Sequence, residues 1–146
     1  MPLKKQTNKK IKVLIVTPEI TYLPAGMGNI ANKLSAKAGG MADVSASLVA
    51  ALYNKGVDVH VALPHYRRMF HVEIADLLDA KLAQYQQTLH PEGEETQRIH
   101  LAEDRMFYYR EHVYSNYTED CLKMSLAFQR EVINNIIPAV RPDLIH

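Results

Sequence analysis

Residues 37–44 (KAGGMADV) bring a lysine, two adjacent glycines and an aspartate together in one short segment. The residues that follow predict a helix, and the first turn of a helix exposes unpaired N–H groups and partial positive charge. Gly39 and Gly40 would let a ligand approach the backbone, and Lys37 would add a mobile positive charge. The segment therefore predicts an anion site, with phosphate as the first candidate. A glycine-rich turn that merely precedes a helix fits the same pattern.

Other charged side chains follow the predicted strands. Glu19 comes just after the apolar run 11–17 (IKVLIVT) and Pro18, and open α/β sheets bind their ligands beyond the carboxyl ends of their strands. Glu19 fits a ligand-lining carboxylate and a solvated loop residue equally well. Arg67 and Arg68 follow a second apolar run, and such a pair faces an anion less often than it is simply solvated.

Two further segments could bind a ligand or be structural. Residues 26–31 (GMGNIA) match the G-x-G-x-x-A pattern of dinucleotide-binding folds, but that fingerprint needs its first glycine in a tight turn directly after a strand. Gly26 comes nine residues after Thr17, and no acidic residue stands at the expected offset of ~20 residues, so a flexible lid or lining loop is the better interpretation. The tyrosine-rich residues 106–117 suit a sugar-binding wall, although an ordinary half-buried surface is the preferred interpretation.

The elements that would position these residues alternate between strand and helix. The runs 11–17 and 57–63 (VDVHVAL) are predicted strands, and residues 41–55 between them are a predicted amphipathic helix. A strand–helix–strand unit gives a parallel sheet with a right-handed crossover, so we expect an α/β fold with flanking helices. The buried stripe of the helix is predicted at Val44, Leu48, Ala51 and Leu52.

The second half of the chain is predicted to continue with helices over 72–87 and 119–137. Thr118 is the expected cap of the latter helix, and Pro138 and Pro142 are expected to end it. Its buried face is predicted at Leu122, Leu126, Ile133 and Ile137.

Short strands are predicted at 99–101 and 106–109, and residues 143–146 have the pattern of the start of another buried strand. A domain rarely ends at the beginning of a core strand. We therefore expect this polypeptide to be a fragment of a longer domain.

Composition and charge narrow the function classes. The formal net charge is +1, with 47% apolar and 23% charged residues, so nothing favours nucleic acid or an anionic membrane as a partner. No apolar run reaches the ~20 residues that a membrane-spanning helix needs. Cys121 is the only cysteine, which excludes an internal disulfide and suits a reducing cytoplasm. The seven histidines show no metal-ligand spacing, and residues 1–10 are expected to be a flexible N-terminus.

Four segments share one family pattern, in the correct order along the chain. They are 13–20 (VLIVTPEI), 37–44 (KAGGMADV), 57–66 (VDVHVALPHY) and 141–146 (RPDLIH). Together they resemble the N-terminal part of bacterial glycogen synthases and plant starch synthases, whose hallmark is K-x-G-G-x-x-D-V after a strand that ends in V-x-P/S-E. The intervening residues 72–97 carry little of the resemblance.

The resemblance implies a retaining glycosyltransferase of GT-B architecture, in which two Rossmann-like domains face each other across the active-site cleft. Members transfer glucose from ADP-glucose, or UDP-glucose in some relatives, to the non-reducing end of an α-1,4-glucan, without an essential metal or other cofactor. Residues 11–146 would be a truncated N-terminal catalytic domain. The C-terminal nucleotide-binding domain is absent, as is the family's H-x-D-W-H segment, which would begin near His146. We therefore expect a cytoplasmic enzyme whose activity this chain alone lacks.

The resemblance also implies roles for single residues. Lys37 would contact the phosphates and the glucosyl region of the donor, and Asp43 would lie beside the sugar and the acceptor, which makes these two the expected catalytic residues. Gly39 and Gly40 would offer backbone N–H groups to the diphosphate. Charge that builds up on a departing nucleoside diphosphate is stabilised by such a lysine and such N–H groups.

Two more substrate-binding residues follow from the resemblance. Glu19 would line the cleft, and Tyr108, in a Y-x-R context with Arg110, would lie near the acceptor. Residues 23–35 make the link between the first strand and K-x-G-G longer than is usual in the family, so the mouth of the active site is expected to differ.

Three other functions stay open. A non-catalytic glucan-binding or regulatory module would share the fold without the chemistry. Another nucleotide-sugar transferase of the same architecture would also fit, because donor-base selectivity belongs to the absent domain. A dinucleotide-binding domain that uses Gly26 and Gly28 fits least well.

Overall fold

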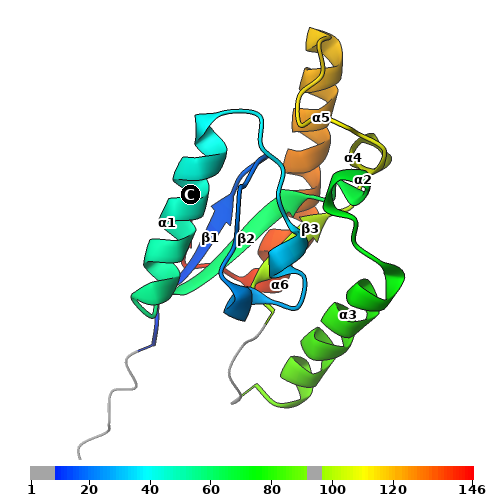
Figure 1. The fold of residues 1–146 in the computed structure, drawn as a ribbon. Coiled ribbons are helices and arrows are strands. Elements are labelled where there is room, and N and C mark those ends of the chain that lie inside the picture. Colours follow the sequence, from blue (N-terminus) through cyan, green and yellow to red (C-terminus); the bar gives the residue numbers. More distant parts are fainter. Residues whose placement is uncertain (1–8, 92–96) are drawn as a thin grey trace, which may run out of the picture.

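Four parallel strands form the centre of the molecule (Figure 1). The structure, a computed structural model, describes residues 9–91 and 97–146, so the flexible N-terminus expected at 1–10 falls mainly outside the described residues. The strand order is β3–β2–β1–β4, and every pairing is parallel. The α/β class and the parallel sheet expected from the sequence are confirmed. The strands are β1 (Lys12–Val16), β2 (Asp58–Pro64), β3 (Ile99–Ala102) and β4 (Leu144–Ile145).

Helices cover both faces of this sheet (Figure 1). The chain moves from β1 through β2 to β3 in one direction and then returns to β4 on the far side of β1. Because parallel crossovers are right-handed, this reversal puts the helices before β4 on the face opposite the helix between β1 and β2. The helices are α1 (Gly40–Asn54), α2 (Arg67–Phe70), α3 (Ile74–Leu89), α4 (Arg105–Tyr108), α5 (Thr118–Glu131), a π-helical turn (Val132–Ile136) and α6 (Ile137–Val140).

The two central strands are buried on both faces. Val13, Leu14 and Ile15 of β1 are in the core, as their continuous apolar run predicts. In β2 the polar position His60 is also fully buried, because both faces of the strand are covered. The expectation of a buried strand at 143–146 is wrong for the described chain. Leu144 and Ile145 of β4 are about half exposed, because β4 is an edge strand that pairs with β1 alone.

The buried face of α1 matches the predicted stripe only in part, because Leu48 and Leu52 are half-buried and pack against the core but the other two predicted residues are exposed. Val44 is 68% exposed, and Ala51 is exposed too. The helix instead buries Ala42, Ala46 and Val49. Val44 lies about 200° around the helix from Ala42, since each residue turns the helix by about 100°. Small alanine side chains let the helix lie close to the sheet, so they face the core although valine is more apolar.

The buried face predicted for the long helix is wrong at three of its four positions. Leu122, Leu126 and Ile133 are exposed, whereas Ile137 is half-buried and packs against the core. The predicted break at Pro138 does not occur, and the helical segment ends at Val140, ahead of Pro142. Helical structure continues through the π-helical turn into α6. Pro138 lies in the first turn of α6, a position where the missing N–H of proline is tolerated. The cap position is Tyr117 rather than Thr118. The side chains that the helical segments bury are Met124, Ala127, Phe128, Val132, Ile136 and Val140.

Residues 106–109 do not form the predicted strand. Arg105–Tyr108 is the short helix α4, and the Asp104 side chain caps it by accepting a hydrogen bond from the Met106 N–H at 2.9 Å. An aspartate at this position favours a helix start over an extended chain. The single turn buries Phe107 and leaves Tyr108 at the surface edge.

The loop before α1 is part of the core, which corrects the expectation of a flexible lid at residues 26–31. Its ends are joined by two hydrogen bonds between Ile20 and Ala36, at 2.8 and 3.0 Å. In the middle, the Met27 carbonyl accepts a hydrogen bond from the Arg98 N–H at 2.8 Å, just before β3. Its buried side chains are Leu23, Met27, Ile30, Ala31 and Leu34.

The same loop anchors α3. The Lys33 ammonium pairs with the Asp76 carboxylate at 2.5 Å, and the Asn29 amide donates to the Asp76 carbonyl at 3.0 Å. The helix expected over 72–87 is confirmed with shifted ends. Its apolar stripe faces solvent, because α3 lies beside the edge of the sheet rather than over a face (Figure 1).

A candidate anion site at the carboxyl edge of the sheet

Lys37 and Asp43, the two residues expected to be catalytic, form an ion pair in the structure. The Lys37 Nζ lies 2.6 Å from the Asp43 Oδ2, and both side chains are about half exposed. The hydrogen bond from Lys37 is the main reason that the pKa of Asp43 lies below its ordinary value. The pair spans the turn where α1 begins, at the end of the sheet where the strands finish (Figure 1).

The glycines between these two residues border open space. A Cβ atom added at Gly39 or at Gly40 would meet no described atom within 4 Å. Gly39 precedes α1 in an extended conformation, without a side-chain cap, and Gly40 is the first helical residue. Packing within the described chain therefore does not require a glycine at either position. The open space leaves room for a ligand against the backbone.

Glu19 lies beneath this turn and is only 2% exposed. Its Oε2 accepts hydrogen bonds from the Ala38 N–H at 2.6 Å and from the Gly39 N–H at 3.0 Å. The interpretation of Glu19 as a solvated loop residue is therefore wrong. In this structure the Gly39 N–H is donated to Glu19, and its expected contact with the diphosphate stays a prediction.

Tyr108 belongs to a separate cluster at the ends of β2 and β3. Its hydroxyl donates to the Glu103 Oε2 at 2.6 Å, and the Arg67 guanidinium stacks 3.6 Å above its ring. The same carboxylate binds Arg67 at 3.1 Å and the buried His65 Nδ1 at 2.7 Å. Arg68, the other member of the arginine pair, binds Glu111 at 2.9 Å. Arg67 thus belongs to the Glu103 cluster, whereas Arg68 forms a solvent-exposed pair at the surface.

Two opposing effects act on the pKa of Glu103 in this cluster. Burial disfavours the charged form of Glu103, but hydrogen bonds from His65 and Tyr108 outweigh it and lower the pKa of Glu103 to about 2. Partial burial, together with the Glu103 carboxylate, raises the pKa of Tyr108 to about 12. The Tyr108 hydroxyl thus already donates to Glu103, and Arg67 covers one face of its ring, so only the rest of the ring is available to a ligand.

Two tyrosines near Glu19 were not singled out from the sequence. The Tyr66 hydroxyl donates to the Pro18 carbonyl at 2.7 Å, and Tyr66 and Tyr114 line a cavity of about 120 Å³ together with Cys121. Burial and then the charge of Glu19 raise the pKa of Tyr114. The tyrosine-rich composition of 106–117 was the available signal for Tyr114. Tyr66 could be placed only once β2 and β1 were seen side by side.

The sequence model of the starch synthase catalytic domain matches residues 12–146. The chain belongs to this family. A glycogen synthase from Moorella thermoacetica is 34% identical to it over 147 residues, which cover 95% of this chain and 27% of that protein. The chain thus spans about a quarter of the relative that it matches, and no solved structure matches it. The resemblance drawn from K-x-G-G-x-x-D-V and its flanking segments is confirmed.

In this member of the starch synthase catalytic domain family, the second glycine pattern has a packing role. A Cβ at Gly26 would come within 1.9 Å of the Tyr53 hydroxyl oxygen, and one at Gly28 within 2.9 Å of the Gln97 side-chain oxygen. These glycines allow the loop to lie against α1 and the start of β3. Close packing, rather than a pyrophosphate, explains the G-x-G-x-x-A match.

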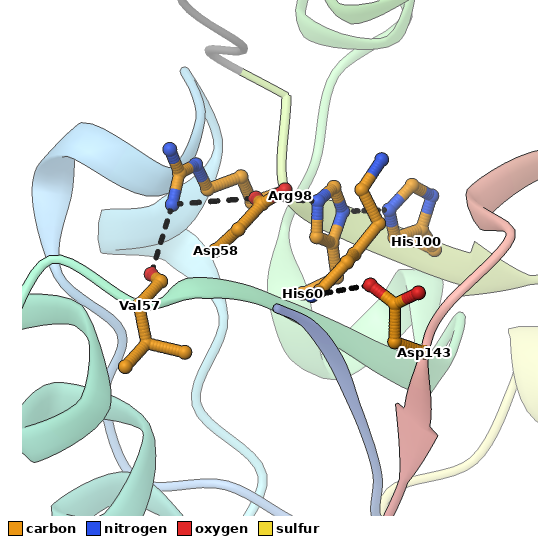
Figure 2. Close-up of polar contacts among 7 residues, drawn as sticks. Val57, Asp58, His60, Arg98, His100 and Asp143 are labelled. Carbon is orange, nitrogen blue, oxygen red and sulfur yellow. Dashed lines mark hydrogen bonds and ion pairs between the residues drawn. The ribbon is translucent and has the colours of Figure 1, made fainter. Parts of the chain in front are cut away.

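A polar cluster in the first half of β2 and β3 lies apart from the carboxyl edge. Figure 2 shows the rings of His60 and His100 next to each other. The His60 Nδ1 lies 2.9 Å from the His100 Nε2. The other His60 nitrogen lies 3.1 Å from the Asp58 carboxylate, which also pairs with Arg98 at 3.7 Å. These contacts join the two strands.

Within residues 9–91 and 97–146, no group of three or more histidine, cysteine, aspartate or glutamate side chains could hold a metal ion. In the same part of the chain, none of the helices is both long enough and apolar enough to cross a membrane.

Proposed function

We propose that this chain forms part of the N-terminal domain of a GT-B glycosyltransferase. The complete enzyme would transfer glucose from ADP-glucose to the non-reducing end of an α-1,4-glucan with retention of configuration. Residues 11–146 would supply one wall of the cleft, and a C-terminal nucleotide-binding domain would supply the other. The observation that carries the proposal is the Lys37–Asp43 pair beside an open glycine turn, in a chain of the starch synthase catalytic domain family.

The geometry suits the departure of a nucleoside diphosphate. Breaking the bond between glucose and phosphate builds negative charge on the leaving group. Lys37 and the first N–H groups of α1, which have no partners within the helix, would stabilise that charge. Positive charge therefore comes from the protein itself, and the proposal needs no metal ion.

The ion pair also suggests how the site changes when the donor binds. Without ligand, Lys37 and Asp43 neutralise each other at 2.6 Å. A diphosphate would compete for the Lys37 ammonium and release the Asp43 carboxylate to the sugar and acceptor side. Tyr108 would contact the acceptor through its ring, because its hydroxyl is held by Glu103.

The test uses the complete polypeptide, meaning these residues together with a C-terminal nucleotide-binding domain. We expect ADP release from ADP-glucose only when glucan is present. Lys37→Ala should lower turnover by about 10²–10³-fold, the usual loss when a donor to developing charge is removed. Lys55→Ala is the matched control, since Lys55 is an exposed lysine at the other end of α1. The melting temperature of each variant should stay close to that of the unmodified enzyme.

Several outcomes would point elsewhere. Normal turnover in Lys37→Ala would refute the site. A preference for UDP-glucose would retain the fold and chemistry but change the donor. Retardation by glycogen in a native gel, without any release of nucleotide, would favour a non-catalytic glucan-binding module. The 146-residue chain by itself is expected to be inactive.

A further inference from the structure

The backbone around Lys37 is held on both sides by two adjacent residues, Glu19 and Ile20, which lie just beyond the end of β1. Ile20 forms two backbone hydrogen bonds with Ala36, and Glu19 accepts the N–H groups of Ala38 and Gly39. Lys37 is therefore clamped between fixed neighbours. This matters because the connecting loop is long, and a long loop by itself does not define the position of the residue that follows it.

The end of β1 is itself well anchored. The Thr17 hydroxyl donates to the Glu19 carbonyl at 2.9 Å and lies 3.3 Å from the Ser45 hydroxyl of α1. The Tyr66 hydroxyl holds the Pro18 carbonyl from the side of β2. The backbone from Thr17 to Glu19 is thus fixed to both α1 and the sheet, so the Glu19 carboxylate can act as a rigid support for the turn.

The Glu19 charge also limits where an anion can bind. Its Oε2 takes the two N–H groups that a phosphate would otherwise find at the base of the turn. A phosphate at that depth would meet a buried like charge, which is strongly unfavourable. The outer side of the turn has Lys37, the start of α1 and the open space over Gly39 and Gly40. An anion is therefore directed to this outer side.

We propose that Glu19 is a positioning residue for the transfer reaction and does not bind substrate. Its carboxylate holds the Ala38 and Gly39 N–H groups from beneath, orients Lys37, and confines the diphosphate to the outer side of the turn. The catalytic half of this inference rests on the proposed function. The structural half concerns hydrogen bonds and anion placement in the 146-residue chain and can be tested by itself.

The first experiment measures amide hydrogen exchange by NMR in the 146-residue chain. Glu19→Ala should speed exchange at Ala38 and Gly39 by about tenfold or more, the effect of losing a charge-assisted hydrogen bond. Glu19→Gln should keep most of the protection, because its amide oxygen can still accept. Asp143→Ala is the matched control, since that carboxylate accepts the Lys12 N–H at the opposite end of β1. Unchanged exchange at Ala38 and Gly39 in Glu19→Ala would overturn the inference.

The second experiment titrates the same chain with inorganic pyrophosphate and follows the amide resonances. In the unmodified chain, the chemical shifts of the Gly40 and Met41 amides should change most, and that of the Ala38 amide should stay unchanged. In Glu19→Ala, the vacated amides should become available, so Ala38 and Gly39 should shift as well. Pyrophosphate shifts at Ala38 in the unmodified chain as large as those at Gly40 would overturn the proposed placement of the anion.

The third experiment measures kcat and KM in the complete polypeptide. Glu19→Ala should lower kcat by about 10²-fold, the loss that a misplacement of roughly 1 Å can cause. Glu19→Gln should recover most of the activity, with the KM for glucan nearly unchanged in both variants. Equal losses in the two variants would show that the charge acts on the substrate directly and would overturn the positioning role. If Glu19→Ala does not fold, Glu19→Gln decides the matter, because near-normal kcat supports positioning and a 10²-fold loss refutes it.

An inactive unmodified enzyme would defeat the proposed function and leave the first two experiments valid. In that case the exchange rates and the pyrophosphate shifts would still confirm or refute the support of the turn by Glu19. The two proposals can therefore fail separately.

Discussion

The loop that leads to α1 and the turn that begins α1 contain the same kinds of residues in opposite surroundings. Each has two glycines and one Lys–Asp ion pair. In the loop, Gly26 and Gly28 are packed against side chains, and Lys33 ties the loop to α3 through Asp76. In the turn, Gly39 and Gly40 border open space, and Lys37 pairs with Asp43 within the same segment.

The difference shows how a glycine pattern should be interpreted. A glycine can be required because another part of the protein occupies the place of a side chain, or because a ligand does. The loop is an example of the first case and the turn is a candidate for the second. Sequence spacing argued against a dinucleotide site in the loop, but only the neighbouring atoms show what occupies the space beside each glycine.

The largest expected contrast between the turn and the loop comes from replacing one glycine of each with alanine. Gly40→Ala should leave stability unchanged or slightly higher, because the new Cβ meets nothing and alanine suits a helix better than glycine. In the complete polypeptide it should lower turnover by about 10²-fold, since the methyl group displaces the donor from its productive position. ADP release and thermal melting measure the two effects. Unimpaired turnover would show that no ligand lies over the turn.

Gly26→Ala should have the reverse effect. The added Cβ would overlap the Tyr53 hydroxyl, so the free energy of unfolding should fall by about 1–3 kcal/mol, as in other overpacked sites. Turnover of the folded enzyme should change little. Urea unfolding of the 146-residue chain measures the loss. Tyr53→Phe removes the overlapping oxygen, and the double variant should therefore recover part of the stability. Absence of any recovery would contradict the packing role.

The smallest effect distinguishes the two ion pairs. Hydrogen bonds from Lys37 and Lys33 are the main causes of the lowered pKa values of Asp43 and Asp76. Both carboxylates therefore favour the folded chain above their ordinary pKa and lose that contribution as the pH falls through the lowered one. Pyrophosphate should draw Lys37 away and raise the pKa of Asp43, leaving Asp76 unchanged. An NMR titration of the carboxyl carbons measures both, and parallel shifts would contradict a specific site at the turn.

Much of the frame could be predicted from local sequence. The β-branched run before Pro18 predicts a buried strand, and the helix that starts at Gly40 follows from the glycines and the apolar period after them. The position of Lys37 and Asp43 at the carboxyl edge then follows from the parallel sheet. In each case the evidence lies within a few residues of the element concerned.

The faces of the helices could not be predicted in the same way. In α1 the predicted stripe is shifted around the helix: Leu48 and Leu52 do pack against the core, but hydrophobicity favours the exposed Val44 over the buried Ala42. In α5 the exposed Leu122 and Leu126 misled the prediction for the same reason. Which stripe is buried depends on how closely the opposing surface approaches, and that surface comes from distant parts of the chain.

The sequence by itself determined the family, the parallel α/β frame and the place of the K-x-G-G turn, because these depend on local order and spacing. Only the tertiary structure decided that Glu19 supports the turn from beneath and that Gly26 is a packing glycine. Glu19 is separated from Ala38 and Gly39 by 19 and 20 positions. A hydrogen bond across such a loop leaves no periodic trace in the sequence, because it depends on how the whole loop folds back.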